Sequence, residues 1–498
     1  MQSRTRIRAA AWTGLAILAV MGHSIARADH FTYVDEEGSE VRIEARLVAS
    51  GQGVHLLELA DGQYRIVPQG AVMKRELSDG PTPLTEEQMA ATLEQRFGAD
   101  HFRSYIQKPF VMGLVLGSPL PKSSELRASS LMKKGARFMT SVAAAFVDFV
   151  GDAQIKITPP RHPLVVLIFE TDADFEAYAE EATGGGSLSA SRISGFYSGL
   201  TNFLAIRLSE CNTFDVPLHE AIHQQVYNRN VFQRFAPVPH WFDEGIATGF
   251  EANNGRITVS PVKISPRYAQ QALASDNFDW KTMAANDKVF MGDVLAGEAY
   301  GQAWGLHWLL VTKYRDQYRA YVRILSAKQP LEVDSIEQRQ KDFETAIQKS
   351  IDELEAEFPT YLSASAKRQR IGLTAPKPPG ISVTTDNLAR VELSAVSLVD
   401  VGQLKVEGKL VNLSPLRSMS FHVTVETDAG TYADWWIDDL GISRTAPLPS
   451  QFVTKAMRNG GLPGQSRTFR VRVRSTTPDS PEAERWRKGE LPIPSFGG

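Results

Sequence analysis

The sequence predicts an α+β protein that is built from several domains. Its 498 residues exceed what a single hydrophobic core usually holds, so the length indicates about three domains. Apolar residues alternate with polar ones near both ends of the chain, as in β-strands, whereas the middle has helical spacing. We therefore expect a mainly helical central domain with a small sheet, preceded by a small β module and followed by an antiparallel β-sandwich.

Residues 1–28 are predicted to be a signal peptide. Three arginines precede an apolar run from 9 to 22, and Ala26-Arg27-Ala28 offers a cleavage site after Ala28. The run is short for a membrane span, and no later stretch reaches the roughly 18 apolar residues that a span needs. We expect export to a bacterial periplasm or secretion, with an uncleaved membrane anchor as the alternative.

The small β module is predicted for residues 29–80. Apolar residues alternate over 41–47, a second apolar run covers 54–59, and Asp61-Gly62 forms a turn. This pattern is typical of a small open barrel of the SH3-like kind. Residues 81–124 are expected to be a helical connector, because 86–97 have helical spacing.

The central domain is predicted for residues 125–367. It combines apolar β-type runs with segments whose apolar residues recur every three or four positions. The expected strands are 164–169 and one or two within 195–208. The expected helices are 131–150, 172–180, one that carries His219, one that Pro239 opens, 299–312, and 336–362.

The C-terminal part is predicted to be a β-sandwich over residues 381–476. A stiff Pro-rich linker, 368–380, precedes it. Strictly alternating runs, such as 404–410 and 469–474, are typical of antiparallel strands with one solvated face. Residues 477–498 are rich in Pro, Glu and Gly, so we expect a disordered tail.

Charge and cysteine content exclude some classes of partner and bond. The net charge of −3 gives no reason to expect nucleic acid or an anionic membrane surface as a partner. Cys211 is the single cysteine, so no intramolecular disulfide can form. We interpret Cys211 as a small apolar residue rather than a metal ligand or nucleophile.

The segment His219-Glu220-Ala221-Ile222-His223 is the strongest chemical signal in the chain. His219 and His223 lie four residues apart, so both lie on one helix face and can bind one metal ion. Glu220 is near enough to take a proton from a metal-bound water without being a ligand. Glu244, 21 residues after His223, would complete a His₂Glu set with an open fourth position, as catalytic zinc requires.

The sequence offers one alternative third ligand and lacks the pattern of another zinc-peptidase class. His240 lies one turn before Glu244 and is the alternative third ligand. A metzincin would need a glycine three residues after His223 and a histidine three residues further on. Those positions hold Val226 and Arg229, so the metzincin pattern is absent.

The run Pro-His-Trp-Phe-Asp-Glu-Gly-Ile-Ala at 239–247 resembles the second-helix signature of gluzincin metallopeptidases. Residues from about 130 to 365 resemble the peptidase-MA-like superfamily, in particular the bacterial DUF1570 domains. The matching pieces are Gly195-Phe196-Tyr197, the segment 219–224, 241–247, Tyr300-Gly301-Gln302-Ala303-Trp304 and 343–346. The resemblance implies a gluzincin-like zinc peptidase domain over 125–367, with Glu244 rather than His240 as the third zinc ligand.

The same resemblance implies roles for further residues. Zinc would polarise the substrate carbonyl, while Glu220 takes a proton from the zinc-bound water and delivers it to the leaving amine. Related gluzincins place a Tyr or His on a helix after the third ligand, which implies Tyr300 as the oxyanion donor, with His307 as the alternative. Asp215 and Asp243 are candidate partners for the ligating imidazoles.

We expect an exported zinc-dependent peptidase that acts on a peptide or protein substrate. An extended peptide would add along the strand at 202–207, which we expect at the edge of the sheet. The alternatives are a zinc hydrolase of a non-peptide amide, and a non-catalytic binding or scaffold protein with a structural zinc site. The flanking β modules are expected to bind or position a cell-envelope partner.

Overall fold

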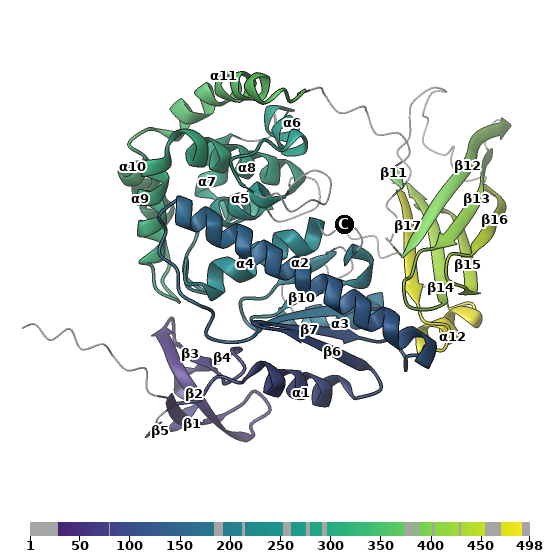
Figure 1. The fold of residues 1–498 in the computed structure, drawn as a ribbon, viewed down its shortest axis with the longest axis horizontal. Coiled ribbons are helices and arrows are strands. Elements are labelled where there is room, and N and C mark those ends of the chain that lie inside the picture. Colours follow the sequence, from purple (N-terminus) through teal and green to yellow (C-terminus); the bar gives the residue numbers. More distant parts are fainter. Residues whose placement is uncertain are drawn as a thin grey trace, which may run out of the picture.

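Over the residues that it describes, the computed structural model shows a mixed α/β chain with four β-sheets (Figure 1). The predicted signal peptide lies outside the described residues, except for Ala28. Over the ranges that the structure describes, no helix is both long enough and apolar enough to cross a membrane. The described ranges are 28–78, 80–183, 193–211, 215–251, 260–274, 279–290, 296–373, 382–383, 388–400, 403–427, 430–453 and 470–490.

The first sheet is antiparallel, with strand order β4-β3-β2-β1-β5. Its apolar residues alternate along the strands, and Phe31, Ala45 and Leu57 meet in a small core of their own. Because β4 and β5 each have one neighbour in this order, the five described strands form an open sheet that does not close into a barrel. The strands are β1 (Ala28–Val34), β2 (Glu40–Gly51), β3 (Val54–Glu58), β4 (Tyr64–Pro68) and β5 (Val72–Ser78).

The second sheet, with strand order β6-β7-β8-β10-β9, forms the centre of the molecule. The three inner strands run parallel, and each edge strand runs antiparallel to its neighbour. The strands are β6 (Phe102–Gln107), β7 (Phe110–Val115), β8 (Leu164–Phe169), β9 (Gly195–Tyr197) and β10 (Leu204–Arg207).

The prediction of a helical connector over 81–124 is wrong beyond its first helix. Helix α1 (Glu86–Phe97) is present, but β6 and β7 follow it and join the central sheet. The apolar run of β7 is only six residues long, and periodicity alone cannot assign such a run to a strand or a helix. Its pairing with β8, about fifty residues later, makes it a strand.

Both faces of the central sheet are covered by helices. The core on one face combines side chains of α1 and α3 (Asp172–Ala182) with alternate residues of β7 and β8. The core on the other face combines α2 (Glu125–Asp152) and α4 (Asp215–Asn228) with the intervening residues of the same strands. Continuous apolar strands such as β8 follow from this double burial.

Helix α5 (His240–Phe250), in which every residue from Trp241 to Phe250 is buried, packs against α4 and α8. The predicted helix over 336–362 is two helices, because Gln348 adopts a left-handed φ of 58° and Ser350 caps a new helix. The helices are α6 (Pro266–Ala274), α7 (Trp280–Ala285), α8 (Ala296–Lys313), α9 (Arg315–Ser326), α10 (Ile336–Ile347) and α11 (Ile351–Gln369).

The C-terminal strands form two sheets, β11-β17-β14-β15 and β12-β13-β16, whose side chains share one hydrophobic cluster. All described pairs are antiparallel except β11 with β17. The strands are β11 (Ser382–Val383), β12 (Ala389–Asp400), β13 (Gln403–Asn412), β14 (Met419–Thr427), β15 (Gly430–Leu440), β16 (Thr445–Val453) and β17 (Arg470–Thr476).

The prediction of disorder from residue 477 is wrong for 477–490. Helix α12 (Pro481–Arg487) begins after Ser480, whose hydroxyl accepts a hydrogen bond from the Ala483 N–H. The Trp486 ring packs edge-on against Trp436 of β15, with 5.1 Å between ring centroids. A polar composition predicted disorder, but one buried tryptophan and a helix cap hold this segment on the sheet.

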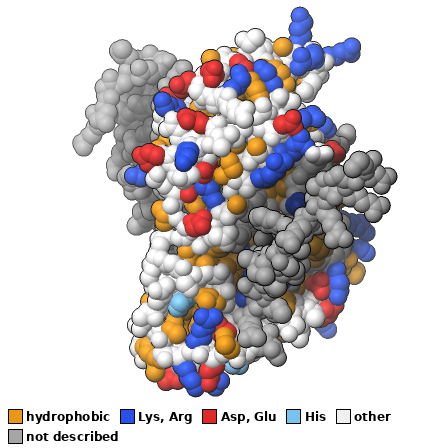
Figure 2. Space-filling model, turned by 90° about the vertical axis from the view of Figure 1, so that its left-hand side faces the viewer, with side chains coloured by type: hydrophobic (Ala, Val, Ile, Leu, Met, Phe, Trp, Pro, Cys, Tyr) orange, Lys and Arg blue, Asp and Glu red, His pale blue; other side chains and the backbone are white. Residues whose placement is uncertain are grey.

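The surface carries charges of both signs. Figure 2 shows Lys and Arg side chains interspersed with Asp and Glu side chains over one face of the molecule. This distribution agrees with the small net charge of −3.

Candidate metal centre

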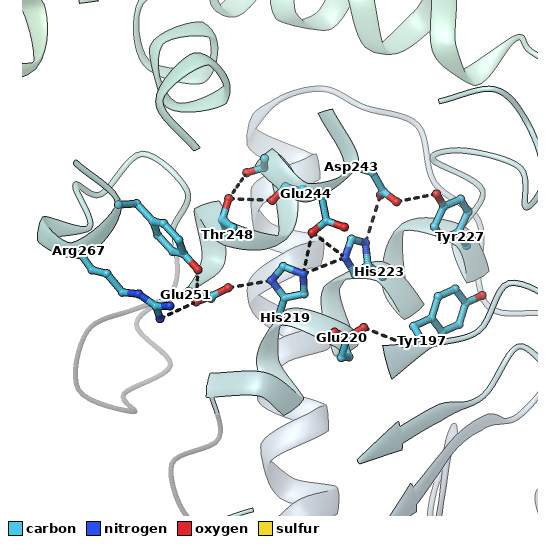
Figure 3. Close-up of polar contacts among 12 residues, drawn as sticks. Tyr197, His219, Glu220, His223, Tyr227, Asp243, Glu244, Thr248, Glu251 and Arg267 are labelled. Carbon is cyan, nitrogen blue, oxygen red and sulfur yellow. Dashed lines mark hydrogen bonds and ion pairs between the residues drawn. The ribbon is translucent and has the colours of Figure 1, made fainter. Parts of the chain in front are cut away.

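Helices α4 and α5 bring the two halves of the motif together. Ala221 and Ile222 of α4 are fully buried in the core beneath the central sheet, so the opposite face of the helix presents His219 and His223. Pro239 caps the start of α5, as the sequence predicted for a helix that begins there. Glu244 lies one turn into α5 and points at the two histidines (Figure 3).

His219, His223 and Glu244 form a group that could hold a metal ion, with donor atoms all within 4.8 Å of one another. His219 Nε2 lies 2.9 Å from Glu244 Oε2 and 3.1 Å from His223 Nε2. The distance from His223 Nε2 to Glu244 Oε2 is 3.7 Å. Ligands about 2.0–2.1 Å from a tetrahedral ion are roughly 3.3 Å apart, so the three spacings fit one ion. The three side chains keep 10–13% of their surface exposed, so solvent reaches the group.

His240, the alternative third ligand, lies outside this group. Its side chain is exposed and its ring contacts Phe290, with 5.5 Å between centroids. Its backbone N–H donates to Asp287 at the start of the helix. The structure therefore brings Glu244, and not His240, to the histidine pair.

Each histidine is held from behind by a carboxylate. Asp243 Oδ1 lies 3.2 Å from His223 Nδ1, and Tyr227 donates to the other oxygen of Asp243 at 2.7 Å. Glu251 Oε1 lies 2.8 Å from His219 Nδ1. These contacts turn both Nε2 atoms toward Glu244, as outer carboxylates do in metal sites.

Sequence reasoning named Asp243 for this role but missed Glu251. Glu251 follows Glu244 by seven residues, which is two helical turns, so the spacing was available as a signal. Tyr268 of α6 donates to Glu251 Oε2 at 2.6 Å and fixes that carboxylate in turn. The side chain of Asp215, the other candidate, lies outside the described residues.

The electrostatics of the group suit a cation. Burial lowers the pKa of His219, but hydrogen bonds to Glu244 and Glu251 outweigh burial and raise this pKa to about 10. Burial raises the pKa of Glu244, yet the two histidines hold it well below its usual range. Without a metal the histidines therefore hold protons against the carboxylates, and a bound cation would displace those protons.

Glu220 lies beside the group without belonging to it. One of its oxygens accepts a hydrogen bond of 2.8 Å from the backbone N–H of Tyr197 on β9. Burial raises its pKa above the ordinary value, although His219 and His223 partly offset this. A carboxylate in such surroundings can accept and return a proton.

Tyr300 and His307 of α8 occupy different places. The Tyr300 ring meets the His219 ring edge-on, with 6.0 Å between centroids. The charge of Glu244, followed by burial, raises the pKa of Tyr300, so its hydroxyl keeps its proton and can donate it. His307 is fully buried behind α5, and burial lowers its pKa to about 3.

The close approach of α5 and α8 explains the glycine of the Asp243-Glu244-Gly245 run. A Cβ atom at Gly245 would lie 2.8 Å from His307 Cβ and 2.9 Å from the Ala303 carbonyl oxygen. His307 instead bonds Tyr318, with 3.2 Å between Nε2 and the hydroxyl oxygen. The structure thus places Tyr300, and not His307, beside the group formed by His219, His223 and Glu244.

The prediction that the strand within 202–207 lies at the edge of the sheet was wrong, because one further strand lies outside it. Strand β10, within the predicted 202–207, lies between β8 and β9. The edge on this side of the sheet is β9, whose Tyr197 contacts Glu220. The misassignment arose because strand order is set by pairing between distant segments, which local alternation does not encode.

Cys211 takes no part in the site. It is buried and does not belong to the candidate metal-ligand group, and burial raises its thiol pKa to about 12. A thiol with such a pKa is a poor nucleophile. Its environment agrees with the predicted packing role.

Residues 216–332 match the sequence model of one protein family. That family, DUF1570, is described as a protein of unknown function. The match covers His219, His223, Glu244 and Tyr300, but it is shorter than the predicted 130–365. No protein of curated function matches the chain.

Proposed function

We propose that the chain is a gluzincin-type zinc metallopeptidase. The observation that carries the proposal is the convergence of His219, His223 and Glu244 on one point, with Glu220 next to an edge strand. Two imidazoles and one carboxylate are the ligand set of many catalytic zinc sites, in which a fourth position stays open. The partial exposure of the group supports such an open position.

The chemistry of the donors favours zinc over harder cations. Calcium and magnesium prefer six or more oxygen ligands, whereas imidazole nitrogens suit zinc. When bound, zinc would act as a Lewis acid toward a carbonyl oxygen and lower the pKa of a coordinated water. Asp243 and Glu251 would keep the two imidazoles oriented toward the ion.

The side chains around the ligands would divide the remaining work. Glu220 would take the proton from the attacking water and pass it to the leaving amine. The protonated Tyr300 hydroxyl would donate a hydrogen bond to the carbonyl oxygen as negative charge develops there. An extended peptide would lie along β9, whose outer side has no strand neighbour in the described sheet.

We further propose that the protein is exported to the periplasm or secreted, on the strength of its N-terminal charge and apolar pattern. A bacterial cell-envelope partner would bind a flanking β domain.

The test substitutes Glu220→Gln in the full chain and measures zinc content and hydrolysis of a casein or mixed-peptide substrate. We expect about one zinc ion per chain in both proteins and hydrolysis in the wild type only. Chelation should abolish wild-type hydrolysis, and added zinc should restore it. Glu180→Gln is the matched control, because Glu180 is exposed on α3 and remote from the metal group.

Each outcome decides between functions. Hydrolysis that survives Glu220→Gln contradicts the assigned base, and absence of bound zinc contradicts the site. Bound zinc with no hydrolysis of any peptide by the wild type would indicate a structural zinc site or a non-peptide amide as substrate. Tyr300→Phe should lower kcat by about 10²–10³, the usual loss for one oxyanion donor, with zinc content unchanged.

A further inference from the structure

The N-terminal sheet is anchored directly on the loop that follows the edge strand β9. The backbone N–H of Tyr64, the first residue of β4, donates to the Leu200 carbonyl oxygen at 2.7 Å. Leu200 lies in the turn between β9 and β10. Figure 1 shows β3 and β4 of this sheet on the side that faces the central domain.

Arg234, which follows α4, ties the same two segments together. One guanidinium nitrogen donates to the Gly199 carbonyl at 3.0 Å, and another donates to the Gly62 carbonyl at 2.8 Å. The guanidinium also lies over the Tyr64 ring, 3.6 Å from its centroid. Only 7% of Arg234 is exposed, so these contacts are shielded from water.

A buried glutamate balances the charge of Arg234. Glu58 of β3 lies 3.6 Å from the guanidinium and 2.6 Å from Arg46. His162 and Arg161, from the segment before β8, approach the same carboxylate at 3.5 and 3.7 Å. Loss of any one contact in such a buried cluster would leave another charge unpaired, which is costly. The cluster therefore holds the N-terminal sheet rigidly against the loop between β9 and β10.

Hydrogen bonds connect the loop between β9 and β10 to Glu220, the proposed general base. The Asn202 N–H donates to the Ser198 carbonyl at 2.8 Å, and the Tyr197 hydroxyl donates to the Asn202 side chain at 2.6 Å. Tyr197 then donates its backbone N–H to Glu220. A shift of Gly199 would therefore move Tyr197, and with it the strand edge beside Glu220.

We propose that the N-terminal sheet is a built-in support of the substrate-binding edge, and that Arg234 is the positioning residue that transmits this support to β9. The role rests on the proposed peptidase function, because it assumes that substrate lies along β9. It differs from the expectation that this module binds a separate partner. Its physical basis is the set of backbone carbonyls, Gly62 and Gly199, that Arg234 holds together.

The experiment compares Arg234→Ala and Arg234→Lys with the wild type in the full chain. Arg103→Ala is the matched control, since Arg103 also donates to two backbone carbonyls and contacts a glutamate, but lies in β6 at the opposite edge of the sheet. Hydrogen exchange of the amides in 195–203 is the first readout. Zinc content and the separate values of KM and kcat are the others.

We expect Arg234→Ala to speed exchange of these amides by roughly tenfold or more and to raise KM several-fold, with zinc content unchanged. Arg234→Lys should bring the exchange rate and KM part of the way back to the wild-type values, because an ammonium group can reach only one of the two carbonyls at a time. Arg103→Ala should leave exchange of 195–203 and KM as in the wild type.

If the backbone amides of 195–203 exchange hydrogen at the same rate in Arg234→Ala and in the wild type, the proposal is overturned. An equal effect of Arg103→Ala also overturns it, because that would indicate general destabilisation. If Arg234→Ala does not fold, Tyr64→Leu removes the ring beneath the guanidinium and provides the same comparison. If the wild type cleaves no peptide, the peptidase function fails, and the exchange measurement still decides whether Arg234 holds the loop.

Discussion

At the proposed zinc site, replacement of Glu251 by alanine should weaken zinc binding without removing any of the three proposed ligands. Glu251 holds His219 through a 2.8 Å contact to Nδ1 and is itself held by the Tyr268 hydroxyl. Loss of such an outer carboxylate usually costs 10–100-fold in metal affinity, which corresponds to about 1.4–2.7 kcal/mol. The burial of the Glu251 side chain, which is only 13% exposed, favours the upper part of that range.

The same substitution should also lower the stability of the metal-free protein. Tyr268 is buried, so its hydroxyl would lose a partner at a cost of about 1–3 kcal/mol. The double variant Glu251→Ala/Tyr268→Phe removes that orphaned hydroxyl. It should regain much of the free energy of unfolding but none of the zinc affinity, which separates the two effects.

The assay is a competition titration with a chromophoric zinc chelator, together with urea unfolding of the metal-free protein. Glu180→Ala, on the exposed side of α3, serves as the control for loss of one carboxylate. A zinc Kd of Glu251→Ala that cannot be distinguished from that of the control would refute the reasoning. The orientation of His219 would then not depend on Glu251.

Three further predictions concern stability and reactivity. Gly245→Ala should destabilise the protein by about 1–3 kcal/mol in urea unfolding, because the new Cβ would overlap His307 and the Ala303 carbonyl; unchanged stability would contradict the packing argument. His162 and Arg46 outweigh burial and hold the pKa of Glu58 at about 2, so its stabilisation of up to about 3 kcal/mol is complete above pH 4.5 and lost as the pH falls toward 2. The difference in free energy of unfolding between the wild type and Glu58→Gln should therefore shrink over that pH range, and a difference that does not depend on pH would refute this role of Glu58. The buried Cys211 thiol should react with Ellman's reagent only after unfolding, and rapid reaction of the native protein would contradict its burial.

Local spacing was sufficient where the chemistry lies on one element. The four-residue interval between His219 and His223 places both on one helix face, and α4 has them there. The apolar run 164–169 was predicted as a strand, and β8 has the same bounds. In both cases the signal comes from residues that are neighbours along the chain.

Local spacing failed where the pairing partner is distant in the chain. The six-residue apolar run of β7 was not predicted as a strand; in the structure it pairs with β6 on one side and, on the other, with β8, about fifty residues later. The order that makes β9 the edge, and the tryptophan contact that holds α12, are likewise contacts between segments far apart. Composition predicted neither of them, since composition does not specify a partner.

The candidate metal site depends on both kinds of contact. His219, Glu220 and His223 follow from helix geometry, and the resemblance of 239–247 to the gluzincin signature named Glu244 in advance. Only the packing of α4 against α5 brings Glu244 within 2.9 Å of His219 and turns His240 to the surface. The reason is physical: helical periodicity is set by bonds within one segment, whereas the meeting of two helices and the contacts of Glu251 depend on the whole buried core.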